Sequence, residues 1–313
     1  MTAFLCYPNY KITHRKFAMN NNYTFYLPKV TPVATLLIVH GMAEHQGRYQ
    51  PFAQFLANHD IAVLTFDHLG HGQQAYDNGC LGYMGNPNPA ELMIDNVMAH
   101  AQLITEKYPD LPHFILGHSM GSFIVRCILQ RYGEQFAGAV IMGTSDFNPL
   151  ANLFVPVTKN LNHFTTRRTN PILDKILNQF NNLPFRKEPD LQGFNWLNSD
   201  PKQVKAYLDD KLCGFQFTNN GYFALMSLMQ AGTNKHWYQQ VPRQLPLLFV
   251  SGKDDPVGQM GKGIPRIVKR LQKNNFASVS VQQYEAMRHE ILLEPNHQQV
   301  YDDILTWLTH HIN

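Results

Sequence analysis

The chain has 313 residues, of which 44% are hydrophobic and 16% charged, and its formal net charge at pH 7 is +3. This length allows one large domain or a domain with an insertion, and this composition is typical of a globular enzyme and not of a disordered tail. No dense block of lysine and arginine is present, so the sequence predicts no nucleic-acid partner.

Short apolar runs alternate along the chain with longer segments of helical periodicity. Predicted strands cover residues 34–41, 61–72, 113–119, 136–145, 245–255 and 278–287. Predicted helices cover residues 48–60, 89–109, 120–133, 263–275 and 296–312. Nearly continuous apolar strands that alternate with helices are typical of a parallel sheet with both faces covered. We therefore expect an α/β fold with a mostly parallel central sheet flanked by helices.

The alternation stops between residues 147 and 237, where the chain is mostly of helical or irregular pattern and rich in Phe and Trp. The sequence predicts an α/β core formed by residues 1–146 and 238–313, with residues 147–237 inserted as a cap over the end of the sheet. Some aromatic side chains of the cap must fill its own small core. We expect others to line an apolar pocket for a substrate.

The start of the chain lacks the basic residues and apolar run of a signal peptide, and no apolar stretch approaches the roughly 20 residues of a membrane span. The four cysteines, Cys6, Cys80, Cys127 and Cys213, are widely spaced. This spacing favours reduced cysteines in a cytoplasmic protein over a disulfide framework or a zinc site.

The segment Gly117-His118-Ser119-Met120-Gly121 fits the pattern G-x-S-x-G, directly after a predicted strand and directly before a predicted helix. In that context the pattern indicates a sharp turn that exposes the serine Oγ above the sheet as a nucleophile. The alternative is a serine in an ordinary structural turn, which the order of strand, turn and helix disfavours.

A serine hydroxyl needs a base to act as a nucleophile, and the base needs an acid that orients it. In folds with this turn the partners follow the serine in the order acid, then histidine. Asp254 and Asp255 both stand at the end of the predicted strand 245–255, and His289 follows the last predicted strand. The sequence therefore predicts His289 as the base and one of the two aspartates as the acid.

Acyl-transfer chemistry also requires two backbone N–H groups that stabilise the developing oxyanion. The residue after the nucleophile, Met120, supplies one. Met42 is expected to supply the other, because Gly41 allows a turn at the end of an early strand. We expect His40 to shape this loop and His118 to pack at the serine turn, and neither to act as a base.

Five segments, HGMAEHQGRY, FDHLGHG, GHSMG, SGKDDPVG and RHEILLE, together resemble the monoacylglycerol lipase and bacterial lysophospholipase group of α/β hydrolases, which are serine hydrolases with a helical cap. The resemblance spans residues from about 34 to 312. It implies that the acid is Asp255, the aspartate of G-x-x-D, and it places the base on His289 and an oxyanion donor on Met42. Leu69 stands where this group commonly has arginine, in a loop outside the three catalytic residues.

The resemblance implies a serine carboxylic-ester hydrolase that acts through an acyl-enzyme on single-acyl-chain lipid esters, either monoacylglycerol or lysophospholipid. The expected catalytic residues are Ser119, Asp255 and His289, with the N–H groups of Met42 and Met120 as the oxyanion hole. No cofactor and no metal are expected. The expected partner is a small lipid ester, with transient contact between the cap and a membrane surface. The head group, the acyl-chain length and the oligomeric state stay open.

Other functions fit parts of the sequence. A prolyl-type aminopeptidase of the same fold needs an acid in the cap to hold the substrate amine, and the cap offers Asp174, Glu188, Asp190, Asp200, Asp209 and Asp210. A small-ester carboxylesterase is a further alternative, whereas a non-enzymatic binding protein is disfavoured because every catalytic part is present. A metal site at Asp67, His68 and His71 is disfavoured because their spacing fits no common tetrahedral arrangement.

Overall fold

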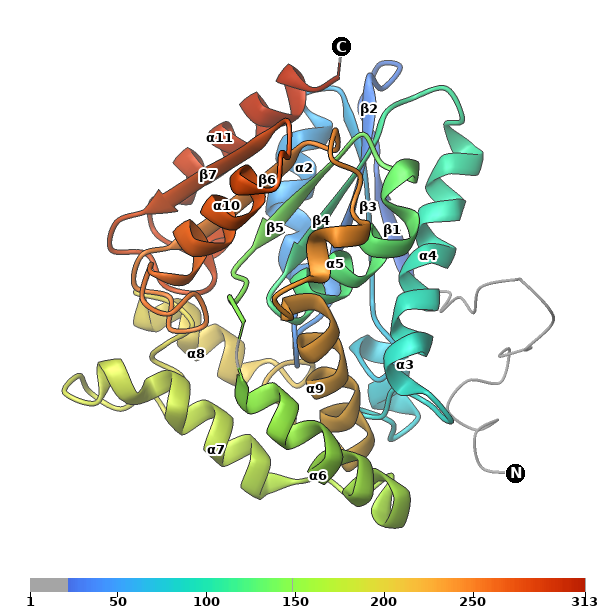
Figure 1. Ribbon diagram of the computed structural model, residues 1–313. Coiled ribbons are helices and arrows are strands. Elements are labelled where there is room, and N and C mark those ends of the chain that lie inside the picture. Colours follow the sequence, from blue (N-terminus) through green and yellow to red (C-terminus); the bar gives the residue numbers. More distant parts are fainter. Residues whose placement is uncertain (1–21, 148, 313) are drawn as a thin grey trace.

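The computed structural model describes residues 22–147 and 149–312, and a seven-stranded sheet lies at its centre (Figure 1). The strands are β1 (Tyr23–Tyr26), β2 (Ala34–Val39), β3 (Ile61–Phe66), β4 (His113–His118), β5 (Gly138–Met142), β6 (Leu247–Gly252) and β7 (Val279–Tyr284). Their order across the sheet is β1-β3-β2-β4-β5-β6-β7. Only β1 runs antiparallel to its neighbour. The predicted α/β fold with a mostly parallel sheet is confirmed.

The central strands are buried on both faces, so successive side chains enter two different cores. On β2, Leu36 and Ile38 pack in one core, and Leu37 and Val39 pack in the other. The helices of the first core are α2 (Gln50–Ala57) and α11 (His297–His310). The helices of the second core include α4 (Pro89–Lys107), α5 (Met120–Tyr132) and α10 (Gly263–Lys273). This arrangement explains why the strands read as continuous apolar runs in the sequence.

Every predicted strand and helix outside the cap is present, with ends that differ by a few residues. Outside residues 147–237, one described strand and one described α-helix were not predicted, the edge strand β1 and the helix α3 (Gly72–Asp77). Both are too short to show a clear period in the sequence. The 3-10 helices are η1 (Gln46–Tyr49), η2 (Gly133–Gln135), η3 (Leu183–Phe185), η4 (Trp237–Gln240) and η5 (Ile291–Leu293).

The segment between β5 and β6 forms α6 (Pro149–Thr165), α7 (Pro171–Asn182), α8 (Pro201–Asp209) and α9 (Asn219–Thr233). Figure 1 shows α6, α7 and α8 gathered on one side of the sheet, at the bottom of the view. Helix α9 contacts α6, α5 and α4, and its residues Tyr222, Leu225 and Leu228 belong to the core that packs on the sheet. The division into core and cap at residues 147 and 237 stays a prediction.

The cysteines differ in part from the expectation. The prediction of reduced cysteines is wrong for Cys80, which is disulfide-bonded. Cys127 and Cys213 are free and buried, and Cys6 lies outside the described residues. Wide spacing in a sequence carries no information about which sulfur atoms meet in space, and for this reason the pattern failed at Cys80.

None of the helices in the described part of the chain combines the length and the apolar character that crossing a membrane requires.

Candidate active site

Ser119 lies in a strained turn between β4 and α5, with φ of 53° and ψ of −119°. A positive φ is unfavourable for a residue with a side chain, so the surrounding structure must hold it. Its neighbours at both ends of the motif must be glycine. A Cβ on Gly117 would lie 2.4 Å from the carbonyl oxygen of Gly121, and one on Gly121 would lie 2.1 Å from that of Val39. The two glycines therefore let the turn press against β2 and keep Ser119 at the end of the sheet.

The loops after β6 and β7 bring Asp255 and His289 together. His289 Nδ1 donates a hydrogen bond to Asp255 Oδ2 at 3.0 Å, and both side chains are buried. The other carboxylate oxygen of Asp255 accepts from the backbone N–H of Val257 at 2.9 Å, which fixes the orientation of the carboxylate. The adjacent Asp254 is partly exposed, and no hydrogen bond joins it to His289 among the described contacts.

The second ring nitrogen of His289, Nε2, is buried and has no hydrogen-bond partner among the described residues. Because Nδ1 carries the proton that bonds Asp255, Nε2 is left with a lone pair. Burial lowers the pKa of His289, but the charges of Asp255, Glu290 and Glu44 and the hydrogen bond to Asp255 raise it, and the result lies above its ordinary value. An imidazole in this state can accept a proton from a hydroxyl placed before it.

The loop after β2 has amides that are already used on either side of Met42. The N–H of Gly41 donates to Glu44 Oε1 at 2.5 Å, and the N–H of Ala43 donates to His71 Nε2 at 3.2 Å. Neither of these bonds involves Met42. This residue lines the same cavity as Ser119 and Met120. The arrangement is compatible with Met42 as an oxyanion donor, as the sequence predicts.

Three buried histidines hold this loop in place. His40 Nε2 accepts from the backbone N–H of His68 at 3.0 Å, and His68 Nε2 donates to the carbonyl of His40 at 3.1 Å. Burial lowers the pKa of His71 to about 3 and that of His68 well below its ordinary value, so both rings are neutral near pH 7. His40 shapes the loop as expected. The rings of His68 and His71 are engaged with backbone groups in the same structure.

A buried network of charges lies behind the loop and the base. Glu44 accepts hydrogen bonds from Tyr49 at 2.8 Å and His118 at 3.1 Å, and it pairs with Arg48 at 2.9 Å. Arg48 in turn binds both carboxylate oxygens of Glu290, the residue next to the base, at 2.5 and 2.9 Å. A bidentate pair of arginine and carboxylate fixes the relative orientation of the two side chains as well as pairing their charges. The network therefore joins the loop after β2 to the loop that carries His289.

Neither Glu44 nor Arg48 is among the site residues predicted from the sequence. Burial alone would raise the pKa of Glu44. The hydrogen bond and charge of His118 and the charge of Arg48 have the larger opposite effect, so the pKa lies well below its ordinary value. His118 packs between this network and the base, since its Nε2 lies 3.2 Å from the carbonyl oxygen of His289. The sequence signal for the network is weak, because an acid and an arginine four residues apart also occur on many solvated surfaces.

A cavity of about 380 Å³ contains Ser119 and His289 in its lining. Much of its wall is apolar and comes from α5, α9 and the segments around them. Those side chains include Phe123, Phe147, Phe215, Leu225, Met226 and Met229. Aromatic residues of the predicted cap thus reach the cavity that contains the serine, and an apolar cavity of this size suits a hydrocarbon chain.

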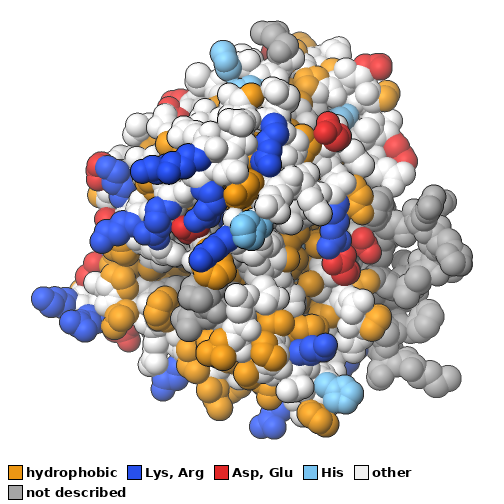
Figure 2. Space-filling view, viewed as in Figure 1, with side chains coloured by type: hydrophobic (Ala, Val, Ile, Leu, Met, Phe, Trp, Pro, Cys, Tyr) orange, Lys and Arg blue, Asp and Glu red, His pale blue; other side chains and the backbone are white. Residues whose placement is uncertain are grey.

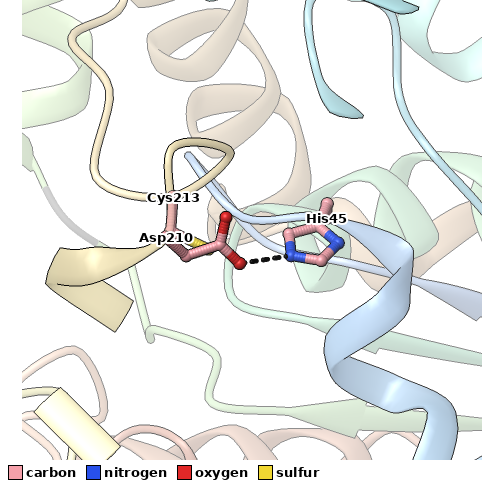
Figure 3. Close-up of side chains that lie close together, drawn as sticks. All are labelled: His45, Asp210 and Cys213. Atoms are coloured by element: carbon pink, nitrogen blue, oxygen red, sulfur yellow. Dashed lines mark hydrogen bonds and ion pairs between the residues drawn. The ribbon is translucent and has the colours of Figure 1, made fainter. Parts of the chain in front are cut away.

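One group of described side chains has ligand atoms close enough to hold a metal ion. These are His45, Asp210 and Cys213, whose ligand atoms lie within 4.8 Å of one another (Figure 3). However, His45 Nδ1 accepts a hydrogen bond from the N–H of Gly47 at 3.2 Å, so the ring proton is on Nε2, which donates to Asp210 at 2.9 Å. A metal-binding nitrogen needs the opposite arrangement of protons. We therefore interpret the group as a contact between the loop after β2 and the segment predicted as the cap.

The same loop and the cap are also joined through the backbone of Ala43. Its carbonyl oxygen accepts from the N–H of Gly214 at 2.9 Å and from the hydroxyl of Tyr207 at 3.0 Å. Both donors belong to the segment predicted as the cap. The position of the loop after β2 thus depends on α8 and the turn that follows it.

Comparisons with known proteins place the chain among similar hydrolases. The family model described as "Serine aminopeptidase, S33" (Hydrolase_4) matches residues 30–296. Monoglyceride lipase of Mus musculus is 28% identical over 295 residues, which cover 92% of this chain and 86% of that protein. Monoacylglycerol lipase of Mycolicibacterium smegmatis is 26% identical, and the match covers 93% of each chain.

Among solved structures, a thermostable carboxyl esterase from Bacillus coagulans in complex with glycerol superposes with a TM-score of 0.86 at 28% identity, covering 93% of this chain and 94% of that one. The resemblance inferred from the five sequence segments is confirmed. The chain belongs to the Hydrolase_4 family of α/β hydrolases, the family described as serine aminopeptidase S33.

Proposed function

We propose that this protein is a serine hydrolase that cleaves single-acyl-chain lipid esters through an acyl-enzyme. One observation carries the proposal: Asp255 and His289, whose Nε2 has no partner among the described residues, form a pair that lines the same apolar cavity as Ser119. The names of the relatives support the substrate class, because the mouse and mycobacterial proteins are lipases of monoglyceride or monoacylglycerol and the Bacillus protein is a carboxyl esterase.

In the proposed mechanism, Ser119 Oγ attacks the ester carbonyl while His289 Nε2 takes its proton. The N–H groups of Met42 and Met120 stabilise the oxyanion of the tetrahedral intermediate. His289 then gives the proton to the leaving alcohol, and the acyl group stays on Ser119. Water, activated by the same imidazole, releases the acid and restores the enzyme. Asp255 keeps the imidazole in the required tautomer throughout.

The acyl chain is proposed to lie in the apolar part of the cavity, so turnover is expected to depend on chain length. Each buried methylene contributes up to about 0.8 kcal/mol, and kcat/KM should rise by no more than about fourfold per carbon until the cavity is full. A series of p-nitrophenyl esters from acetate to palmitate, kept below the micelle threshold, measures this. A steady fall from acetate upward would instead favour a small-ester carboxylesterase, and strong activity on triacylglycerol would contradict the single-chain preference.

The raised pKa of His289 predicts the pH dependence of turnover. The base must be neutral to accept the serine proton, so kcat/KM should fall as pH drops through the pKa of His289. Because this pKa lies above the ordinary 6.5, the loss should already be visible at pH values where a free histidine is neutral. A pH profile of kcat/KM on a soluble ester tests this prediction. A midpoint below 6.5 would show that burial outweighs the surrounding carboxylates.

The exposed faces of α6 and α7 support the proposed transient contact with a membrane surface. Large hydrophobic side chains are exposed along both helices, with Phe164 79% and Ile172 71% exposed. The others are Leu153, Val157, Ile176 and Phe180, and Leu183 follows directly after α7. Figure 2 shows hydrophobic side chains gathered over the lower part of this face, where Figure 1 places α6 and α7. Exposed apolar patches of this kind mark contact surfaces, and a lipid bilayer fits an enzyme of lipid esters.

Vesicle flotation tests the membrane contact. The double variant Phe164→Ser and Ile172→Ser is expected to bind phosphatidylcholine vesicles more weakly than the wild type, because two of the most exposed apolar side chains are lost. Its turnover of a short soluble ester should stay close to that of the wild type, since neither residue lines the cavity. Equal vesicle binding by both proteins would contradict the proposed surface.

The family description, serine aminopeptidase S33, is consistent with the alternative function of an aminopeptidase. Of the six cap acids that the sequence offered, Asp174 lines the cavity, whereas Asp210 bonds His45, Glu188 pairs with Arg288 and Asp209 pairs with Lys205. Turnover of an amino-acyl amide, compared with turnover of a monoacylglycerol, separates the two functions.

The cytoplasmic location of the protein stays a prediction.

A further inference from the structure

Arg288, the residue directly before the base, binds the segment predicted as the cap. Its Nη2 lies 2.6 and 2.8 Å from the two carboxylate oxygens of Glu188, and its Nη1 donates to the carbonyl oxygen of Asn195 at 2.6 Å. The guanidinium also lies over the ring of Phe185, with its carbon 4.0 Å from the ring centroid. Arginine can make several such contacts at once, because its guanidinium is planar and carries five donors. One side chain beside His289 therefore meets three separate positions of that segment.

The same two stretches of chain are also joined through their backbones. The N–H of Glu290 donates to the carbonyl oxygen of Leu197 at 2.8 Å. The carboxylate of Glu294 accepts from the backbone N–H of Arg288 at 2.8 Å, and it also accepts from the backbone N–H of Ser199, at 3.0 Å, and from its hydroxyl. The segment from the predicted cap and the loop that carries the base thus form one hydrogen-bonded unit.

The base lies between two pairs of arginine and carboxylate. Arg288 pairs with Glu188 of the predicted cap at 2.6 Å, and Glu290 pairs with Arg48 of the loop after β2 at 2.5 Å. Because the pairs involve the residues on either side of His289, they hold the backbone from which the imidazole projects. Both arginine side chains are nearly buried, so water and salt screen these pairs less than a pair on the surface. The pair with Glu188 depends on the position of the predicted cap, whereas the pair with Arg48 does not.

We propose that Arg288 is a positioning residue, which through its pair with Glu188 makes the orientation of the base depend on the position of residues 185–199. The inference rests on the proposed function, because it concerns the histidine that takes the proton of Ser119. Transfer of that proton requires Nε2 within hydrogen-bond distance of Oγ, and a displacement of about 1 Å can cost a hundredfold in rate. The ring of Trp196, whose centroid is 5.0 Å from that of the base, belongs to the same segment and lines the cavity. A shift of this segment would thus move the wall of the cavity and the base together.

The variant Glu188→Ala tests this coupling on a soluble ester such as p-nitrophenyl butyrate. Removal of the carboxylate leaves Arg288 free to change its rotamer, so kcat is expected to fall by about tenfold. KM should stay within about twofold, because Glu188 is not among the described residues that line the cavity. The variant Glu188→Asp keeps the charge at a position that is 42% exposed and should recover most of the loss. Asp209→Ala removes an exposed cap carboxylate that pairs with Lys205, so it is the matched control and should keep the wild-type kcat.

A double variant shows whether Glu188 acts through Arg288. Arg288→Gln alone and Arg288→Gln combined with Glu188→Ala should have the same kcat within about twofold, because the second substitution removes no further support of the base. Losses that multiply in the double variant would show that Glu188 acts on its own. An unchanged kcat in Glu188→Ala would show that the pair does not position the base.

Thermal melts and the wild-type activity separate the remaining outcomes. A lower melting temperature in Glu188→Ala, with a loss of kcat that Glu188→Asp does not recover, would assign the pair to the stability of the cap alone and overturn its role at the base. A wild type that cleaves no ester would overturn the proposed function itself. That failure is distinct from failure of the coupling, which requires an active wild type and an equally active Glu188→Ala.

Discussion

Ser119→Ala is expected to lower kcat on a soluble ester by about four to six orders of magnitude, as loss of the nucleophile does in other serine hydrolases. The reason is that Ser119 Oγ forms the covalent bond of the proposed acyl-enzyme, and Ser119 lies at the turn between β4 and α5 in the same cavity as His289. Removal of one oxygen leaves the glycines of the turn in place, so the fold should remain intact. Kinetics on p-nitrophenyl butyrate and a thermal melt followed by circular dichroism measure both effects.

A folded Ser119→Ala protein that keeps more than about a tenth of wild-type activity would show that this serine is not the nucleophile. Labelling with a fluorophosphonate probe gives an independent readout. The wild type is expected to react and the variant is not, because the probe traps the activated serine itself.

Asp255→Asn is expected to give the second largest loss, about ten-thousandfold in kcat. An amide at this position donates a hydrogen to His289 Nδ1, so the imidazole adopts the tautomer that has its proton on Nε2 and cannot accept one from Ser119. The bond at 3.0 Å between Asp255 Oδ2 and His289 Nδ1 is the contact that the substitution reverses. Steady-state kinetics on a short ester measure the effect.

The adjacent aspartate provides a matched control. Asp254→Asn makes the same chemical change one residue away, at a partly exposed position that has no hydrogen bond to His289 among the described contacts. Its effect on kcat is expected to be far smaller. If the ranking of the two variants were reversed, the acid would be Asp254, and the match to G-x-x-D would have selected the wrong residue.

Local chemistry explains how much of the site the sequence could predict. The turn at Ser119 depends on two glycines within its own motif, and Asp255 and His289 each follow a strand that has a clear apolar run. The parallel sheet then brings these strand ends together, because the carboxyl ends of parallel strands share one edge. Each of these steps can be followed in the sequence without knowledge of distant contacts.

The parts that the sequence did not predict depend on contacts between distant residues. Arg48 and Glu290 are 242 positions apart, and their contact exists only because the loop after β2 and the loop after β7 meet. Helix α7 illustrates a different limit. Asp174 and Asn178 line the cavity together with Leu177, whereas Ile172 and Ile176 are exposed. The period of apolar residues alone does not predict this mixed face. Which face of a cap helix lines a cavity is decided by its surroundings.

The two hydrogen bonds that Ala43 accepts from Tyr207 and Gly214 limit how freely the cap can be exchanged. A chimera that takes its whole cap from a relative would replace both donors, and the loop beside Ser119 would lose two of its supports together with the substrate pocket. A graft restricted to α6 and α7 would leave these donors in place. Within this chain, substrate selectivity can therefore diversify along residues 149–182 at little cost to the chemical step, whereas the stretch from Tyr207 to Gly214 must vary in step with the loop it holds.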